Sequence, residues 1–246
     1  MAGMPDHQHC EDPVLAYDRL AAIYAELVLK RARYLAGVER EILARIAPGS
    51  GSLLDVGAGH GGRALDIASR TGIQRIVLVE PSEKMLPACK ETEIWRLRAE
   101  ELSKAPRSVK FEVITCLWNV LGHIKGTAPR VQALSGITSL LSENGRFFMD
   151  VNHRYNARAY GVLATSVRIV RDVFLPSEEN GDVRVHWNAS RERVSTYGHV
   201  FTHKEVAQLA EKAGLKLEER IVVDYDDGCV RHSPFQGNLL YVFRRA

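Results

Sequence analysis

The stretch LLDVGAGHGG at positions 53–62 decides the fold and leaves open what the fold holds. Its glycines at 57, 59 and 62 match G-x-G-x-x-G, the spacing with which a strand turns tightly into a helix beneath a pyrophosphate. Asp55, however, precedes the first glycine by two residues, and a carboxylate there repels phosphate and suits a ligand with ammonium and sulfonium groups. The next predicted strand, RIVLVE, ends at Glu80, which can accept hydrogen bonds from both hydroxyls of a ribose. Adenosine with a cationic tail therefore fits better than NAD, and a dinucleotide oxidoreductase is disfavoured.

Length and composition indicate one α/β domain. The chain has 246 residues, of which 46% are hydrophobic and 26% charged, as in ordinary globular proteins. The net charge is only +3, with both signs interleaved, and no basic, aromatic-interleaved appendage is present. We therefore expect no nucleic-acid partner, which argues against an RNA-modifying enzyme.

The sequence also allows an expectation about the cellular location of the protein. No apolar run approaches the roughly 20 residues of a membrane-spanning helix, and the first ten residues lack the apolar centre of a signal peptide. The four cysteines are scattered without a C-x-x-C pair, which indicates neither a disulfide framework nor a zinc site. We therefore expect a cytoplasmic protein with no membrane partner.

Strands and helices alternate through the first part of the chain. The predicted strands lie at 52–57, 75–80, 93–99, 109–117 and 146–151. Helices are predicted between them at 61–70, 82–92 and 130–141. This alternation predicts right-handed crossovers and a mainly parallel sheet covered on both faces.

The remaining segments differ in character. Residues 14–46 have helical spacing, with Gly37 as the expected break. RIVRDVF at 168–174 and the run at 183–200 are rich in β-branched residues, and we interpret both as antiparallel strands inserted into the α/β frame. A helix follows at 202–214, where Thr202 and Glu205 form a capping box, and strands at 216–225 and 238–245 end the chain.

The sequence DVGAGHGG followed by VLVEPSEKML resembles the cofactor signature of the class I S-adenosylmethionine-dependent methyltransferases. The resemblance implies a Rossmann-like, seven-stranded, mainly parallel sheet within a single domain, 1–246. We expect an N-terminal helical lid at 1–48 and a cofactor-binding core at 49–154 and 202–246. The inserted segment, 155–201, would cover the substrate or form a surface for a homodimer.

The resemblance also implies S-adenosyl-L-methionine as cofactor and assigns residues to it. The backbone at Gly57 and Gly59 would approach the methionine part, Glu80 would hold the ribose, and Met85 would pack on adenine. Where these enzymes usually have Asp-Ala, this chain has Arg98 and then Ala99, so that Ala99 or Glu100 would contact the adenine amino group. The full set is Tyr24, Arg31, Asp55, Gly57, Ala58, Gly59, Glu80, Pro81, Met85, Ala99, Glu100 and Leu117.

A closer likeness is to the glycine and sarcosine N-methyltransferases and related small-molecule enzymes. CLWNVLGHI at 116–124 is similar to their C-L-x-N-x-x-x-H segment, in which the Leu region touches the cofactor and the Asn faces the substrate. Tyr24 and Arg31 keep the seven-residue spacing of a Tyr and an Arg in that family, where the Arg meets the cofactor carboxylate. The residues assigned to the substrate are Tyr17, Trp118, Asn119 and Arg154.

MDVNHRYN at 149–156 resembles the family's D-H-R-N-Y motif, with Val151 and Asn152 as two extra residues. An amino-acid substrate therefore does not follow. Asp150, His153 and His123 are the candidate catalytic residues, and Asp150 with His153 are also candidate ligands for Mg²⁺.

Methyl transfer from a sulfonium is a direct displacement, which requires alignment and exclusion of water. A neutral amine attacks unaided, whereas a hydroxyl needs a base or a metal. The candidate bases favour O-methylation of a small sugar-like or polyol-like acceptor. N-methylation of a small amine or amino sugar is the alternative, and a non-catalytic S-adenosylmethionine-binding regulator is a third reading.

Several of these residues also have a purely structural interpretation. Arg31 lies in the basic run LVLKRARY, where a solvated helix face is equally compatible with the sequence. Met85 and Leu117 are compatible with a place in the core, and His123 with a structural role. Trp118 is more typical of a core aromatic than of a substrate cage.

Overall fold

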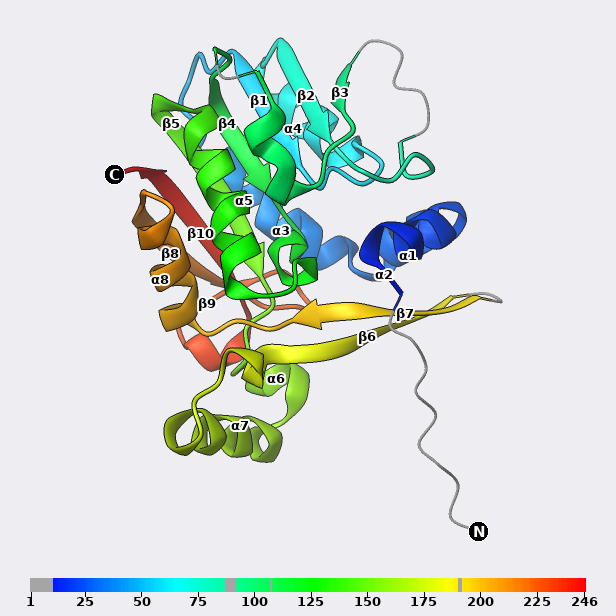
Figure 1. Ribbon diagram of the computed structural model, residues 1–246, viewed down its shortest axis with the longest axis vertical. Coiled ribbons are helices and arrows are strands. Elements are labelled where there is room, and N and C mark those ends of the chain that lie inside the picture. Colours follow the sequence, from blue (N-terminus) through cyan, green and yellow to red (C-terminus); the bar gives the residue numbers. More distant parts are fainter. Residues whose placement is uncertain (1–10, 87–91, 107, 190–191) are drawn as a thin grey trace.

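The computed structural model describes residues 11–86, 92–106, 108–189 and 192–246 (Figure 1). Its centre is an eight-stranded sheet with the strand order β3-β2-β1-β4-β5-β10-β8-β9. The strands are β1 (Ser52–Val56), β2 (Arg75–Val79), β3 (Glu93–Trp95), β4 (Phe111–Cys116), β5 (Leu141–Val151), β8 (Leu215–Val223), β9 (Val230–Arg231) and β10 (Asn238–Arg245).

The sheet is parallel from β3 to β5, and β10 then runs antiparallel to both β5 and β8. The Rossmann-like α/β architecture expected from the alternation is confirmed. The two-residue strand β9 adds an eighth member at the edge beside β8, where seven strands were expected. Because β1 is central, its carboxyl end and the glycine loop open at the middle of one sheet edge, where open α/β sheets bind ligands.

Helices cover both faces of the sheet. One face packs on α5 (Thr127–Leu140), α8 (His203–Lys212) and the 3₁₀ segment η2 (Ala99–Lys104). The other packs on α3 (Ala32–Leu43) and α4 (Gly62–Thr71). Neighbouring strand residues separate to opposite sides, Leu54 to the first cluster and Leu53 to the second, as the alternation of side chains along a strand requires.

The N-terminal helices are interrupted twice. They are α1 (Pro13–Leu20), η1 (Ala21–Ile23), α2 (Tyr24–Lys30) and α3. The break expected at Gly37 was wrong, since α3 runs through it and the interruption falls at Arg31. Gly37 is there for space: a Cβ at this position would lie 2.2 Å from the carbonyl oxygen of Gly228.

The inserted segment forms two different structures. A hairpin of β6 (Asp182–Ala189) and β7 (Glu192–His199) forms a separate two-stranded sheet and confirms the antiparallel expectation for 183–200. Figure 1 shows it extending toward α1. The strand expected at 168–174 was wrong, because this stretch belongs to the helix α7 (Val162–Phe174), which follows α6 (Ala157–Tyr160). Its apolar residues recur every three or four positions from 163 onward, and that period outweighs the β-branched composition.

Two other local expectations have mixed outcomes. The capping box of Thr202 and Glu205 at the start of α8 is confirmed by both hydrogen bonds. The helix expected at 82–92 is absent from its described part, since 83–86 form turns, and residues 87–91 lie outside the described residues. Every described helix is too short or too polar to cross a membrane.

The contact between Gly37 and Gly228 gives a test of how α3 is held. We expect Gly37→Ala to destabilise the fold by about 1–3 kcal/mol, because the added methyl group meets backbone rather than a flexible side chain. Gly51→Ala is the matched control, since its Cβ would lie 3.4 Å from the nearest atom. Urea denaturation of both variants measures the effect. Equal stabilities would show that the two backbones separate at little cost.

Candidate active site

The glycine loop turns at the carboxyl ends of β1 and β2. The amide nitrogens of Gly57 and Ala58 both donate to the carbonyl of Val79, at 2.8 and 3.1 Å. Gly57 and Gly59 have φ values of +71° and +58°, a conformation that residues with a side chain rarely adopt. A Cβ on Gly57 would also lie 2.5 Å from Val120 Cγ2. Glycine is required here for both conformation and space, which leaves a surface of bare backbone.

Two buried carboxylates flank this loop. Asp55 Oδ1 accepts a hydrogen bond from Thr115 Oγ1 at 2.6 Å, whereas Oδ2 has no hydrogen-bond partner among the described residues. Glu80 accepts the amide of Gly59 through Oε2 and that of Ser82 through Oε1, each at 2.9 Å. Burial raises the pKa of Asp55, and it raises the pKa of Glu80 to about 6. A buried acid left with an unpaired oxygen is costly unless a ligand completes it.

A cavity opens between the glycine loop and α1, and it gathers residues that are far apart in the sequence. We call it the glycine-loop cavity. It is lined by Pro13, Val14, Tyr17, Tyr24, Gly57, Gly59, Arg63, Glu80, Pro81, Leu97, Arg98, Ala99, Glu100, Leu117, Trp118, Val120, His123 and Ile124. Eight of the twelve residues assigned to the cofactor are in this set, although their roles there stay predictions. They are Tyr24, Gly57, Gly59, Glu80, Pro81, Ala99, Glu100 and Leu117.

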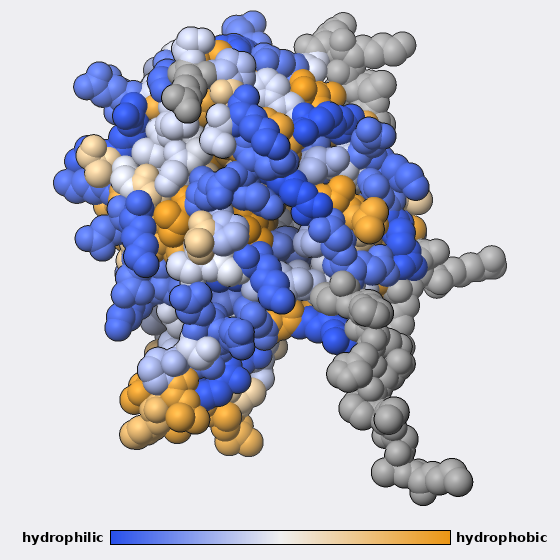
Figure 2. All heavy atoms as spheres, in the orientation of Figure 1, coloured by the Kyte–Doolittle hydropathy of each residue, from blue (hydrophilic) through white to orange (hydrophobic). Residues whose placement is uncertain are grey.

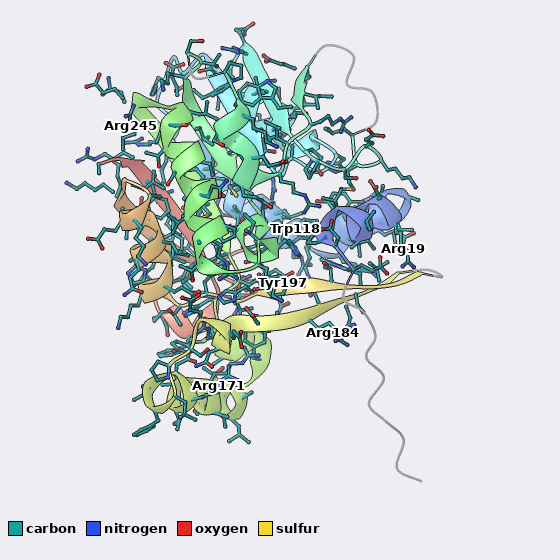
Figure 3. All side chains as sticks on the ribbon, viewed as in Figure 1. Arg19, Trp118, Arg171, Arg184, Tyr197 and Arg245 are labelled. Atoms are coloured by element: carbon teal, nitrogen blue, oxygen red, sulfur yellow. The ribbon has the colours of Figure 1, made fainter. Side chains whose placement is uncertain are left out.

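A second cavity shares Tyr17, Trp118 and His123 with the first, and we call it the adjoining cavity. It lies between the N-terminal helices and the hairpin. Its lining is Tyr17, Leu27, Lys30, Arg31, Trp118, Asn119, His123, Asn152, Val185, His186, Trp187 and Tyr225. Figure 3 shows Trp118 beside the N-terminal helices and Tyr197 on β7, and the Trp118 and Tyr24 ring centroids are 5.7 Å apart.

His123 and Tyr17 form a hydrogen-bonded pair where the two cavities meet. His123 Nδ1 lies 2.9 Å from the carbonyl oxygen of Tyr197, and Nε2 lies 3.1 Å from the Tyr17 hydroxyl. A carbonyl only accepts, so Nδ1 carries the proton. Burial lowers the pKa of His123, which leaves the ring neutral at pH 7, and burial raises the pKa of Tyr17. Nε2 is therefore a lone-pair acceptor that faces a hydroxyl donor.

Asp150 lies beneath the cavities and holds the backbone in place. Trp118 and Asn119 both have positive φ, 63° and 60°, a conformation that costs about 1–3 kcal/mol for each such residue. The amide of Trp118 donates to Asp150 Oδ1, and the Tyr34 hydroxyl donates to Oδ2 at 2.5 Å. Both oxygens of this buried carboxylate are thus engaged with the protein. Asp150 is a positioning residue here, in place of the base expected from the sequence.

His153 and Arg154 face away from the glycine-loop cavity. His153 Nδ1 lies 2.8 Å from the Pro234 carbonyl, and burial lowers the pKa of the ring to about 4. Both residues line a third cavity, between α7 and α8, instead of the first two. Asn152, one of the two extra residues of the altered motif, lines the adjoining cavity in their place. Arg154, which the sequence analysis assigned to the substrate, therefore lies outside the first two cavities.

The Mg²⁺ site expected from Asp150 and His153 is not formed. Each carboxylate oxygen of Asp150 accepts a hydrogen bond, one from the Trp118 amide and one from the Tyr34 hydroxyl, and His153 lines a different cavity. Among the residues that the structure describes, no group of three or more His, Cys, Asp or Glu side chains is placed to hold a metal ion.

Arg63, and not Arg31 as the sequence indicated, lies at the glycine-loop cavity. Arg31 stacks on Tyr225, 4.1 Å from the ring centroid, and lies 3.3 Å from Asp226, so it borders the adjoining cavity. Arg63, which the sequence analysis missed, lines the glycine-loop cavity. No hydrogen bond or ion pair of its side chain occurs within the described part of the chain, and its charge opposes the rise in the pKa of Asp55. The sequence feature that could have predicted this position of Arg63 is that it follows the glycines directly, in GGR.

The remaining assigned residues, Ala58, Met85 and Asn119, are buried, and Asn119 also lines the adjoining cavity. Met85 Cε lies 3.3 Å from where a Cβ of Gly59 would stand. Asn119 donates to the carbonyl of His199 at 3.2 Å and accepts the amide of Asn152 at 2.9 Å. It ties the strained turn to β7 and to the end of β5.

Comparison with known proteins identifies the family of this chain. Residues 28–220 match the profile of a methyltransferase domain, and the chain belongs to this family. It is an S-adenosylmethionine-dependent methyltransferase. A comparison of the sequence with curated proteins finds no significant match.

Solved structures share the fold at low sequence identity. An S-adenosylmethionine-dependent methyltransferase from Clostridium acetobutylicum has a TM-score of 0.65 and 13% identity, covering 94% of this chain and 99% of the other. The CcbJ methyltransferase from Streptomyces caelestis has a TM-score of 0.69 and 16% identity, covering 94% and 98%. An amino pentose methyltransferase of calicheamicin biosynthesis from Micromonospora echinaspora, solved with S-adenosylmethionine bound, has a TM-score of 0.60 and 16% identity, covering 91% and 97%.

The residues of the glycine-loop cavity fit S-adenosylmethionine. Among the lining residues, Gly57 and Gly59 present bare backbone and Glu80 presents a carboxylate, which suit a cationic ligand. Asp55 is buried outside the lining, and one of its oxygens has no partner among the described residues. Burial raises the pKa of Glu80, and the charge of Asp55 raises it further, so the two carboxylates are close enough to interact.

Helix α1 closes this cavity through a small number of polar contacts. Arg98 Nη2 lies 2.8 Å from Asp12 Oδ1, and Ser82 Oγ donates to Asp18 at 2.5 Å. Pro13 supplies part of the cavity lining. These exposed contacts are weak, while Ala16 and Leu20 of α1 are buried in a cluster with Leu27 and Val194.

We expect Arg98→Ala to speed hydrogen exchange in residues 13–20 by up to about fivefold, since the exposed ion pair contributes about 0.2–1 kcal/mol. Added S-adenosylhomocysteine should slow that exchange again. Arg75→Ala is the control, because it removes the similarly exposed pair with Glu93 at the amino ends of β2 and β3, the ends opposite to the cavity. Unchanged exchange in the Arg98 variant would mean that other contacts hold α1.

Proposed function

We propose that this enzyme transfers a methyl group from S-adenosylmethionine to an amine nitrogen of a small polar molecule bound in the adjoining cavity. The observation that carries the proposal is that Asp150 and His153, two of the three bases that a hydroxyl acceptor was expected to use, line neither cavity, whereas a neutral amine needs no base. The His123–Tyr17 pair lies where the adjoining cavity meets the glycine-loop cavity. A nucleophile in one cavity and a methyl donor in the other would meet beside a neutral proton acceptor.

The lining of the adjoining cavity supports a small polar acceptor. Trp118 and Trp187 form one wall, with ring centroids 6.2 Å apart. The buried Nε1 of Trp187 has no hydrogen-bond partner among the described residues, so an acceptor oxygen is the group that would complete it. None of the described lining residues is acidic, so a nitrogen entering as an ammonium ion gains no counter-charge there. These features favour a neutral amine on a hydroxylated scaffold.

Two structural neighbours point the same way. The amino pentose methyltransferase shares this fold, and so does a sugar N-methyltransferase from a Streptoalloteichus species. The low identities limit this support to the fold, and the acceptor argument depends on the lining of the adjoining cavity.

We assign the cofactor contacts to five groups of the chain. Glu80 would accept hydrogen bonds from the ribose hydroxyls, and the backbone at Gly57 and Gly59 would lie along the methionine part. Asp55 would balance the cationic charge. Arg63 would hold the carboxylate, in place of Arg31, whose guanidinium is already stacked on Tyr225.

When bound, S-adenosylmethionine supplies a sulfonium methyl carbon that is open to direct displacement. The chain contributes alignment and exclusion of water, because α1 and the β6–β7 hairpin cover the two cavities. Tyr17 can accept a proton from the methylated nitrogen while its own hydroxyl proton passes to His123 Nε2. The carbonyl of Tyr197 keeps the His123 tautomer that makes this possible.

A hydroxyl acceptor, which the sequence analysis favoured, is the second candidate. Two of the three groups that motivated it, Asp150 and His153, do not line either cavity. The specific observation in its favour is that His123 is neutral and aimed at Tyr17, so that a general base is already in place.

The role of Arg63 can be separated from that of Arg31. We expect Arg63→Met to weaken S-adenosylhomocysteine binding about 10- to 150-fold, because a charge-assisted hydrogen bond contributes about 1.5–3 kcal/mol. Arg31→Met should change it less than threefold, since its contacts are to Tyr225 and Asp226. Calorimetry on both variants provides the comparison. A larger loss for the Arg31 variant would restore the role implied by the family resemblance.

The acceptor class can be tested with matched substrates and pH. We expect turnover with amino sugars and not with the corresponding sugars that have a hydroxyl at the same position. For an amine, the rate should rise with pH up to the pKa of the amine, roughly 8 when neighbouring oxygens withdraw electrons, as for an α-amino group. For a hydroxyl with His123 as base, the rate should be flat above pH 6.5 and fall only below it, because the pKa of His123 is lowered.

The His123→Gln variant completes this test, with His153→Gln as its control. General-base assistance contributes about 10²- to 10⁴-fold in rate, so a loss of that size with His123→Gln and a flat pH profile would favour the hydroxyl acceptor. A loss below tenfold with a rising profile would favour the amine. His153→Gln should leave turnover unchanged, because that ring lines the third cavity.

A further inference from the structure

Helix α7 presents a continuous apolar face to solvent. Figure 2 shows this surface as an orange cluster at the end of the molecule occupied by α7 in Figure 1. The residues are Val162, Leu163, Val167, Val170, Val173 and Phe174, with Leu175 just beyond the helix, and their exposed fractions range from 55% to 80%. At 100° per residue, the six helical positions fall within one arc of about 140°, in which Ser166 is the only polar residue.

The opposite face of α7 is fixed to the rest of the chain. Asp172 Oδ2 accepts hydrogen bonds from buried Arg154 at 2.9 Å and from the Tyr155 hydroxyl at 2.7 Å. Arg168 donates to the carbonyl of Arg154 at 3.1 Å, and Arg171 donates to that of Asn180. The helix is therefore anchored by its polar side, so the apolar side is held outward.

The apolar face contributes nothing to the fold of its own chain. Thr165 is the only buried residue of α7, and no α7 residue belongs to the three hydrophobic clusters of the described chain. Hydrophobic patches of this kind on a well-anchored element mark an interaction surface.

We propose that this face, the α7 face, binds the α7 face of a second copy of the chain and forms a two-fold symmetric dimer. The seven exposed residues offer roughly 700 Å² of apolar surface, above the ~300–600 Å² of the largest patch on a typical monomer and close to the ~800 Å² per partner of a standard interface. A symmetric contact requires a surface that complements itself. An uncharged apolar arc meets that requirement, because pairing it with its own copy brings no like charges together.

The charges of α7 favour a second copy over a lipid surface. A helix that lies on a membrane usually exposes Lys and Arg beside its apolar face. Here Arg168 and Arg171 donate to carbonyl groups of their own chain, and Arg168 also stacks on Tyr160 at 4.1 Å. The dimer leaves both cavities of the active site untouched, since no residue of α7 lines them.

Sedimentation equilibrium at micromolar concentration tests the proposal. The wild-type chain should have twice its mass of 27.5 kDa. Val170→Glu, which places two charges at the contact through the symmetry, should raise the dimer dissociation constant about 100-fold or more. Leu29→Glu is the control, because Leu29 is an exposed apolar residue on α2 (74%, against 55% for Val170), and it should leave the dimer intact.

Circular dichroism and thermal melting of the monomer confirm that Val170→Glu still folds, which is expected because Val170 touches no core cluster. A wild-type chain that stays monomeric would overturn the proposal, and so would a monomer that pellets with anionic vesicles. A dimer that survives Val170→Glu, or that dissociates with Leu29→Glu instead, would also overturn it by placing the contact elsewhere.

Discussion

The active site depends on one buried carboxylate. Asp150, at the end of β5, accepts the backbone N–H of Trp118 and the hydroxyl of Tyr34. These contacts join the central sheet, the turn after β4 and helix α3. The turn holds two successive residues in a left-handed conformation, which the chain would not keep without such contacts. Because Trp118 lines both cavities, the position of their shared wall follows from this carboxylate.

A second buried network holds the inserted segment. Arg154 pairs with Asp172 of α7 at 2.9 Å and with Glu205 of α8 at 2.7 Å, and Glu205 also lies 2.7 Å from His199 on β7. The buried guanidinium of Arg154 is stable only when it has partners, so its pairs with these partly buried acids favour a single arrangement of hairpin and helix. Arg154 is thereby committed to structure, and its guanidinium is not available to a substrate in the adjoining cavity.

The two networks hold different parts of the molecule in place. The Asp150 contacts shape the cavities in which we place cofactor and acceptor, and the Arg154 network carries the hairpin that covers the acceptor side and the helix that faces outward. The N-terminal helices close the remaining side through exposed contacts such as Asp12 with Arg98. We predict that these helices move aside to admit two molecules and then close to exclude water, which the hydrogen exchange of residues 13–20 would show.

The sequence by itself determined the parallel sheet, the glycine loop and the placement of Glu80, because these depend on local period and on residues within about 30 positions of each other. It also located His123, since the family segment around it is continuous. It did not determine which candidate base faces a cavity. Asp150, His153 and Arg154 are neighbours in sequence, and their directions are set by α3, by the Pro234 loop and by Asp172, all far along the chain. Tertiary structure decided those roles, as it decided that Arg63 and not Arg31 lines the glycine-loop cavity, because a charged side chain goes where a distant partner or an open cavity receives it.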